Sequence, residues 1–162
     1  MEKKASGYGT LIRDGKRQCM GCMEFFDKEY DVCPHCGEEV DRPVRELLHM
    51  DPGTLIHDRY IVGRAIGYGG FGITYIGWDT KLKRKVAIKE YMPSEFSTRM
   101  MHKSDLLIAN NEKKQKQFED GKAKFLREAE KLAQVGNVDG IVHVYDSFEE
   151  NKTAYITMDY LE

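Results

Sequence analysis

A glycine-rich segment followed by a lysine carries the clearest chemical signal in this chain. Residues 67–72 read Gly-Tyr-Gly-Gly-Phe-Gly, and residues 86–89 read Val-Ala-Ile-Lys after one strand-like segment. Glycines let backbone amides approach phosphate oxygens, and a lysine on a strand supplies a fixed positive charge against the same phosphates. The spacing therefore predicts a phosphate cradle for a nucleotide, with Lys89 beneath it.

Four cysteines near the amino terminus form a second candidate site. They are two C-x-x-C pairs separated by ten residues, namely Cys19, Cys22, Cys33 and Cys36. Each pair can turn both thiolates toward one point, and two facing pairs give the tetrahedral set that a structural zinc ion prefers. Two disulfides or an iron site are the alternatives, and a reducing compartment disfavours the disulfides. We expect His35 to be a solvated loop residue and not a ligand.

The metal should supply most of the stability of this short module, because so few residues cannot bury enough apolar surface to fold alone. The module is acidic, which disfavours nucleic acid as a partner, since carboxylates repel phosphates. A protein partner or a structural cap fits better. The acidic residues are Glu24, Asp27, Glu29, Asp31, Glu38, Glu39 and Asp41.

Composition sets the class of protein. The chain has 162 residues, of which 41% are hydrophobic and 32% charged, and its net charge is −2. These values suit one modest globular domain with a smaller appendage, and they give no reason to expect a polyanion or a membrane surface as partner. The amino terminus lacks the apolar run of a secretory signal, and no segment is long enough to span a bilayer. We therefore expect a cytoplasmic protein.

The sequence predicts four segments. Residues 1–14 are a flexible amino terminus, residues 15–41 the zinc ribbon, and residues 42–58 a linker that is apolar enough to pack on the next domain. Residues 59–162 form the larger domain.

The larger domain is predicted to be α+β, with a five-stranded antiparallel sheet and one major helix. Period-two patterns predict the strands, and apolar residues at helical spacing predict the helix, with a possible kink at Gly121 and an end at Gly136. A short hairpin is expected within residues 94–110. The predicted strands and helix span residues 60–66, 73–79, 85–91, 141–148 and 153–160, and residues 111–135.

Residues 55–162 resemble the small lobe of a protein kinase of the bacterial Ser/Thr type. The glycine loop lies between two strands, and the lysine strand, the helix and two further strands follow in kinase order. This resemblance implies that Lys89 holds the α and β phosphates of ATP. The sequence Phe-Leu-Arg-Glu-Ala at 125–129 looks like the family's helix motif and implies Glu128 as the ion-pair partner of Lys89. Glu130 is a rival that helical periodicity does not exclude.

Residues 155–161 resemble the last strand of that lobe and the hinge to the large lobe. The resemblance makes Met158 the gatekeeper, and it places the carbonyl of Asp159 and the amide of Leu161 at the adenine edge. Thr74 departs from the valine usual at its position. The implied ATP-binding set is Ile66, Gly67, Gly69, Gly70, Gly72, Thr74, Ala87, Lys89, Met158, Asp159 and Leu161.

The family's catalytic base and magnesium ligands have no counterpart up to Glu162. We therefore expect these residues to be inactive alone and to self-associate through the surface that would face a large lobe. In an intact parent we expect magnesium-dependent transfer of the ATP γ-phosphate to serine or threonine hydroxyls of a protein. A pseudokinase-like or zinc-ribbon interaction module is the alternative. The presence of both Lys89 and Glu128 favours the kinase over the interaction module, because a pure scaffold has no physical need for this pair.

Overall fold

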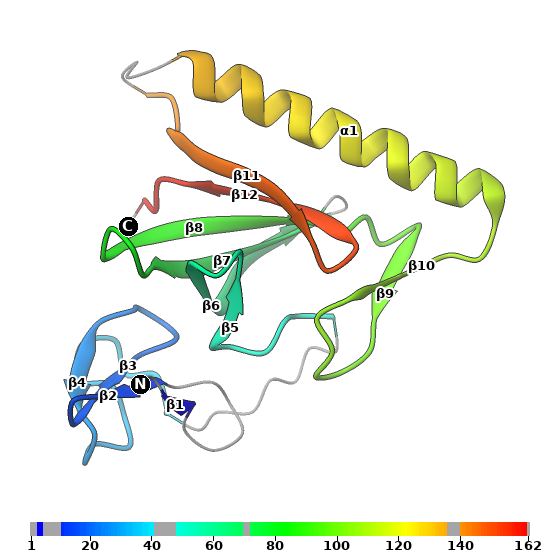
Figure 1. Ribbon diagram of the computed structural model, residues 1–162. Helices are drawn as coiled ribbons and strands as arrows, with labels where there is room; N and C mark the ends of the chain where they lie inside the picture. The colour runs from blue at the N-terminus through cyan, green and yellow to red at the C-terminus, as the bar shows by residue number, and fades with distance from the viewer. Residues whose placement is uncertain (1–2, 5–10, 41–47, 70–71, 136–139, 162) are drawn as a thin grey trace.

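The structure of the protein, a computed structural model, describes residues 3–4, 11–40, 48–69, 72–135 and 140–161. These residues form a large sheet with one long helix, a two-stranded hairpin, and a small sheet in the cysteine module (Figure 1). The helix runs along the side of the large sheet where β11 and β12 lie. The cysteine module lies on the other side, near β6 and β7.

The large sheet has six strands in the order β11-β12-β8-β7-β6-β5, and all neighbours are antiparallel. The α+β class is confirmed, but the sequence predicts only five of these strands. The sixth, β5, lies in the predicted linker and is too short for a period-two pattern to reveal it. The bounds are β5 Thr54–Ile56, β6 Tyr60–Gly69, β7 Gly72–Asp79, β8 Arg84–Tyr91, β11 Val144–Glu150 and β12 Thr153–Met158.

Helix α1 is continuous through Gly121, so this segment is one helix and not two separate pieces. Asn111 caps its start, because the side-chain oxygen accepts a hydrogen bond from the Lys114 backbone N–H at 3.2 Å. The Tyr91 ring of β8 packs on Phe118 with ring centroids 5.0 Å apart, and the Tyr91 hydroxyl donates to the Phe118 carbonyl at 2.9 Å. Each fully buried phenylalanine contributes roughly 2 kcal/mol. The helix spans Glu112–Val135 and buries Phe118, Phe125 and Ala129.

The segment between β8 and α1 folds as a separate hairpin, as the sequence predicts. The Leu106 N–H donates to the Asn151 carbonyl at 3.0 Å, which ties the hairpin to the turn between β11 and β12. The Ala109 N–H donates to the Phe96 carbonyl at 2.8 Å and closes the hairpin just before the helix. Its strands are β9 Ser97–Arg99 and β10 Leu106–Ile108.

The cysteine module contains a four-stranded sheet in the order β1-β2-β3-β4. The first cysteine pair follows β3 directly, and the second pair follows β4. The strands are β1 Lys3–Lys4, β2 Leu11–Arg13, β3 Lys16–Gln18 and β4 Phe25–Asp27.

The cysteine module docks on the large sheet through two methionines of its first knuckle. Met20 and Met23 are buried and form one apolar cluster with Ile61 of β6 and Ile76 of β7. The Arg64 N–H of β6 donates to the Met20 carbonyl at 2.9 Å, so the contact includes a backbone hydrogen bond. Each fully buried methionine contributes roughly 2 kcal/mol, so this contact stabilises the module and the sheet together.

Two ion pairs border this contact. Arg64 Nε lies 2.5 Å from Glu38 Oε1, and Lys85 Nζ lies 2.8 Å from Glu24 Oε1. Arg64 Nε and Glu38 Oε1 are both buried, whereas the Glu24 side chain is about half exposed. An exposed pair such as Lys85–Glu24 contributes less than about 1 kcal/mol. The contact therefore combines the apolar methionine cluster with one buried ion pair.

Gly63 of β6 makes this docking possible. A Cβ atom at position 63 would collide with the Met23 Cε atom, the Met20 backbone oxygen and the Ile76 side chain. Only a residue without a side chain lets the knuckle backbone reach the strand.

Several predicted features lie outside the described residues. They are most of the amino terminus 1–14, linker residues 42–47, Gly70 of the glycine loop, and the helix end at Gly136. Of the described residues, no helical stretch has the length and apolar character that crossing a membrane requires.

Gly63→Ala should destabilise the protein by about 1 to 3 kcal/mol, because overpacking displaces the two methionines. Chemical denaturation measures the change. Gly67→Ala is the matched control, because its Cβ would enter open space. Equal stability of the two variants would show that the knuckle does not need the close approach at Gly63.

Candidate metal centre and nucleotide site

The four cysteine sulfurs gather at one point. All four Sγ atoms lie within 4.8 Å of one another. The Cys19 and Cys36 sulfurs are 3.6 Å apart, and the Cys22 and Cys33 sulfurs are 3.7 Å apart. Four sulfurs about 2.3 Å from a tetrahedral zinc ion lie about 3.8 Å from one another. The donor set therefore fits a structural zinc ion, which would crosslink the two knuckles when bound.

Disulfides and a histidine ligand fit these residues less well than a four-sulfur metal site. A disulfide needs a sulfur separation of about 2.05 Å, and all four cysteines are free thiols. His35 lies outside the sulfur cluster, and its Nε2 is 3.3 Å from the Phe25 carbonyl oxygen. Burial raises the pKa of Cys22 to about 11, so this thiol keeps its proton at neutral pH until a metal displaces it.

Four predicted nucleotide-binding residues share one face of the large sheet. Thr74 of β7 lies directly opposite Lys89 of β8, and Ala87 lies opposite Met158 of β12. Opposite residues in antiparallel strands point to the same face, and residues two apart along a strand do so too. Ile76, which contacts the cysteine module, lies opposite Ala87 and is therefore on this face. The module thus covers one end of the face that carries Lys89.

The glycine-rich segment includes the end of β6 at Gly69 and the start of β7 at Gly72. Gly67 and Gly69 have open space where a side chain would be, so their backbone is accessible to a ligand. Gly72 is packed tightly, because a Cβ there would collide with the Glu90 carbonyl oxygen of β8. The segment is therefore anchored at its carboxyl end, and Tyr68, near the end of β6, is 82% exposed.

A pocket of about 320 Å³ lies between β8 and α1. Lys89 and Glu128 both line it, with Phe125 supplying apolar surface, and Glu130 is not part of the lining. The Glu128 carboxylate lies 4.0 Å from Lys124 Nζ, and no ion pair joins Lys89 to Glu128 among the described residues. The two groups thus face one cavity without touching, and their catalytic roles stay predictions.

The predicted hinge is fixed to the start of β11 by one carboxylate. Asp159 accepts hydrogen bonds from the His143 N–H at 2.9 Å and from the Tyr145 hydroxyl, and its own N–H donates to the His143 carbonyl at 3.0 Å. The Tyr145 hydroxyl holds the pKa of Asp159 below its ordinary value, and burial opposes this shift. The Arg84 guanidinium lies 3.9 Å above the Tyr145 ring. Leu161 and Ile66, at the predicted adenine edge, are exposed.

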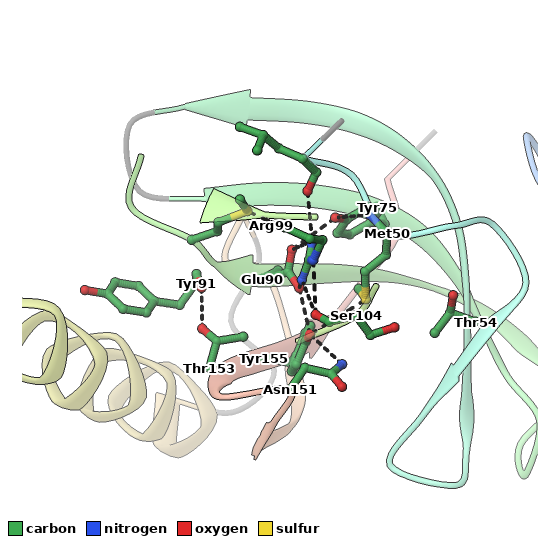
Figure 2. Close-up of polar contacts among 12 residues, drawn as sticks. Met50, Thr54, Tyr75, Glu90, Tyr91, Arg99, Ser104, Asn151, Thr153 and Tyr155 are labelled. Carbon is green, nitrogen blue, oxygen red and sulfur yellow. Dashed lines mark hydrogen bonds and ion pairs between the residues drawn. The ribbon is translucent and has the colours of Figure 1, made fainter. Parts of the chain in front are cut away.

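Sequence reasoning missed a buried ion pair beside Lys89. Glu90 and Arg99 are fully buried and joined by two hydrogen bonds, and the hydroxyls of Tyr75 and Tyr155 also donate to the Glu90 carboxylate (Figure 2). Burial raises the pKa of both tyrosines, so the hydroxyls remain donors. The period-two pattern of the lysine strand contained a signal, because it places Glu90 on the face opposite Lys89.

Comparison with known proteins identifies the larger domain. A probable serine/threonine-protein kinase of Clostridium acetobutylicum is 31% identical over 109 residues, which cover 67% of this chain and 13% of that protein. The probable serine/threonine-protein kinase PknB of Bifidobacterium longum is 32% identical over 120 residues, which cover 68% of this chain and 14% of that protein. The chain belongs to the bacterial Ser/Thr protein kinase family. It spans only a small part of these relatives, and no family model matches it.

A solved structure titled PpkA-294 apo form agrees with this membership. It superposes with a TM-score of 0.62 at 34% identity, covering 70% of this chain and 39% of that one. The sheet, the glycine loop and α1 are those of a kinase small lobe, and the four-cysteine cluster fits a zinc ribbon that precedes it.

Removal of zinc should unfold the ribbon and lower the thermal midpoint of the small lobe by several degrees, because Met20 and Met23 lose their support against Ile61 and Ile76. Thermal denaturation before and after chelation tests this prediction, with the metal content of each sample measured in parallel. Added zinc should restore the midpoint. A zinc-free protein with an unchanged thermal midpoint would show that the metal-bound ribbon does not stabilise the small lobe.

The Asp159 carboxylate should titrate below its ordinary value of 3.8. Because its folded-state pKa is lowered, the stability it contributes is complete above the ordinary value and is lost as pH falls through the folded pKa. Carboxyl chemical shifts measured by NMR report the midpoint. Tyr145→Phe removes the largest cause and should raise that midpoint. An unchanged midpoint in this variant would disprove the assigned hydrogen bond.

Proposed function

We propose that this chain is the ATP-binding small lobe of a protein Ser/Thr kinase. With a large lobe, it would transfer the γ-phosphate of ATP to serine or threonine hydroxyls of a protein. The observation that carries the proposal is that Lys89 lies opposite Thr74, two residues after Gly72 of the glycine-rich segment, and lines the pocket that Glu128 also lines. Family membership supports the reaction class.

Lys89 is suited to bind phosphate. Its side chain is exposed and makes no ion pair with a described residue, so its charge is available to the α and β phosphates. Glu128 would pair with Lys89 after a shift of α1 narrows the pocket, and the pair would then hold the ammonium group in place. The exposed position of Glu128 leaves it free to change partners.

The rest of the site would bind the nucleotide by shape. The accessible amides of the glycine loop would cover the phosphates, and Thr74 and Ala87 would pack on adenine from above. The carbonyl of Asp159 and the amide of Leu161 would meet the adenine edge. Magnesium ligands and the catalytic base would come from the large lobe, so we expect no phosphate transfer by these residues alone. The zinc ribbon would be structural.

A second function, a pseudokinase-like or ribbon-mediated interaction module, has one observation in its favour. Lys89 and Glu128 do not pair with each other in this structure, as a scaffold without catalysis would permit. The ribbon also exposes Tyr30 and Val32, which could contact a protein partner. Phosphate transfer by the intact parent distinguishes the two functions.

Lys89→Met in the full-length parent should lower the rate of phosphate transfer by about 100-fold or more, because a preorganised charge on the phosphates is lost. Transfer from labelled ATP to a generic protein substrate measures the rate. Lys81→Met, at an exposed turn, is the matched control and should keep the original rate. Full activity of Lys89→Met, or an inactive parent, would overturn the proposal.

A further inference from the structure

We propose that Glu90 and Arg99 are a positioning pair that sets the separation of Lys89 and Glu128 when nucleotide binds. This inference rests on the proposed function, since Lys89 and Glu128 are the groups that it assigns to ATP. Neither Glu90 nor Arg99 lines the pocket. They act through strand β8 and through the hairpin that precedes α1.

Every N–H donor of Arg99 is occupied. Its two Nη atoms donate to the two carboxylate oxygens of Glu90 at 2.9 and 2.5 Å. Nη1 also donates to the Leu48 carbonyl at 2.8 Å, and Nε and Nη2 donate to the Ser104 carbonyl at 3.0 and 2.9 Å. Both charged side chains are 0% exposed. A guanidinium held this way has one orientation, because its planar donors match a fixed set of acceptors.

Both oxygens of the Glu90 carboxylate accept further hydrogen bonds. Tyr75 of β7 and Tyr155 of β12 donate to it at 3.0 and 2.7 Å, and the Met50 N–H donates to the Tyr75 hydroxyl at 3.1 Å (Figure 2). The network thus joins three strands, the segment before β5 and the hairpin. A fully satisfied buried network specifies one arrangement of the segments that it joins.

The first consequence concerns Lys89. Glu90 is the next residue on β8, so the two side chains point to opposite faces. A slip of one residue would bring Lys89 into the buried network and Glu90 into the pocket. Because the Glu90 charge has its partners only inside, the network fixes the register and directs Lys89 to the pocket.

The second consequence concerns Glu128. Arg99 belongs to β9, in the hairpin that leads directly to α1. Phe96, just before β9, lines the same pocket and accepts the Ala109 N–H just before the helix begins. The ion pair therefore holds the hairpin, and the hairpin holds the start of α1. Loss of the pair would let α1 move relative to β8 and would change the distance between Lys89 and Glu128.

A second ion pair provides a matched control. Arg59 donates to both carboxylate oxygens of Asp79 at 2.9 and 2.7 Å, and Asp79 is buried. This pair also stabilises the fold, but it closes the outer ends of β6 and β7, and neither residue lines the pocket between β8 and α1. A purely structural role for Arg99 would make the two pairs equivalent.

The test uses the zinc-loaded full-length parent and measures the ATP dissociation constant and the thermal midpoint. Arg99→Met should weaken ATP binding about tenfold, which is within the range of coupling between residues that act together. Arg59→Met should lower the thermal midpoint but leave ATP affinity within about twofold. In a Lys89→Met background, Arg99→Met should have no further effect on ATP affinity, because it acts through Lys89.

Two results would overturn the inference. One is equal ATP affinity in Arg99→Met and Arg59→Met, and the other is an Arg99→Met effect that persists without Lys89. If Arg99→Met does not fold, the double variant Glu90→Gln with Arg99→Met removes both charges and is compared in the same way. If Lys89→Met alone leaves ATP binding unchanged, the proposed function itself fails, whereas a clear Lys89 effect with no Arg99 effect rejects only the positioning role.

Discussion

The alternation of side chains along β8 is the constraint on which the rest of this structure depends. Val86, Ile88 and Glu90 point into the buried interior of the lobe, and Ala87 and Lys89 point to the opposite face. Of the side chains that point into the interior, the Glu90 carboxylate needs charged and hydroxyl partners from other segments of the chain. Those partners determine where the hairpin, and after it the helix, can lie. One strand thus connects the polar interior of the lobe to the face that carries Lys89.

Much of this arrangement could be predicted from the sequence, because local patterns encode it. The spacing of the cysteines predicts a sulfur cluster, and the four sulfurs do lie together. Helical periodicity predicts α1, and the glycine loop followed by the lysine strand predicts the order of strands in the lobe. Each feature depends on residues close in the chain, so a single sequence contains the whole signal.

The remainder depends on contacts between distant segments, which have no local pattern. Arg99 lies in a segment without clear periodicity, and its burial depends on partners from β8, from the segment before β5 and from its own hairpin. The docking of Met20 on the sheet likewise needs Gly63, 43 positions further along the chain. The separation of Lys89 and Glu128 is a property of helix placement, which residue types alone do not determine.

The close approach of the Met20 carbonyl to Gly63 also makes the ribbon part of the backbone pairing of the lobe. The pairing of β6 with β7 shifts register between Val62 and Ala65, and the Arg64 N–H in this irregular stretch donates to the Met20 carbonyl at 2.9 Å. A module that a metal ion would hold together thus supplies an acceptor for a strand of the lobe, so metal supply and the integrity of the sheet are connected through one backbone hydrogen bond.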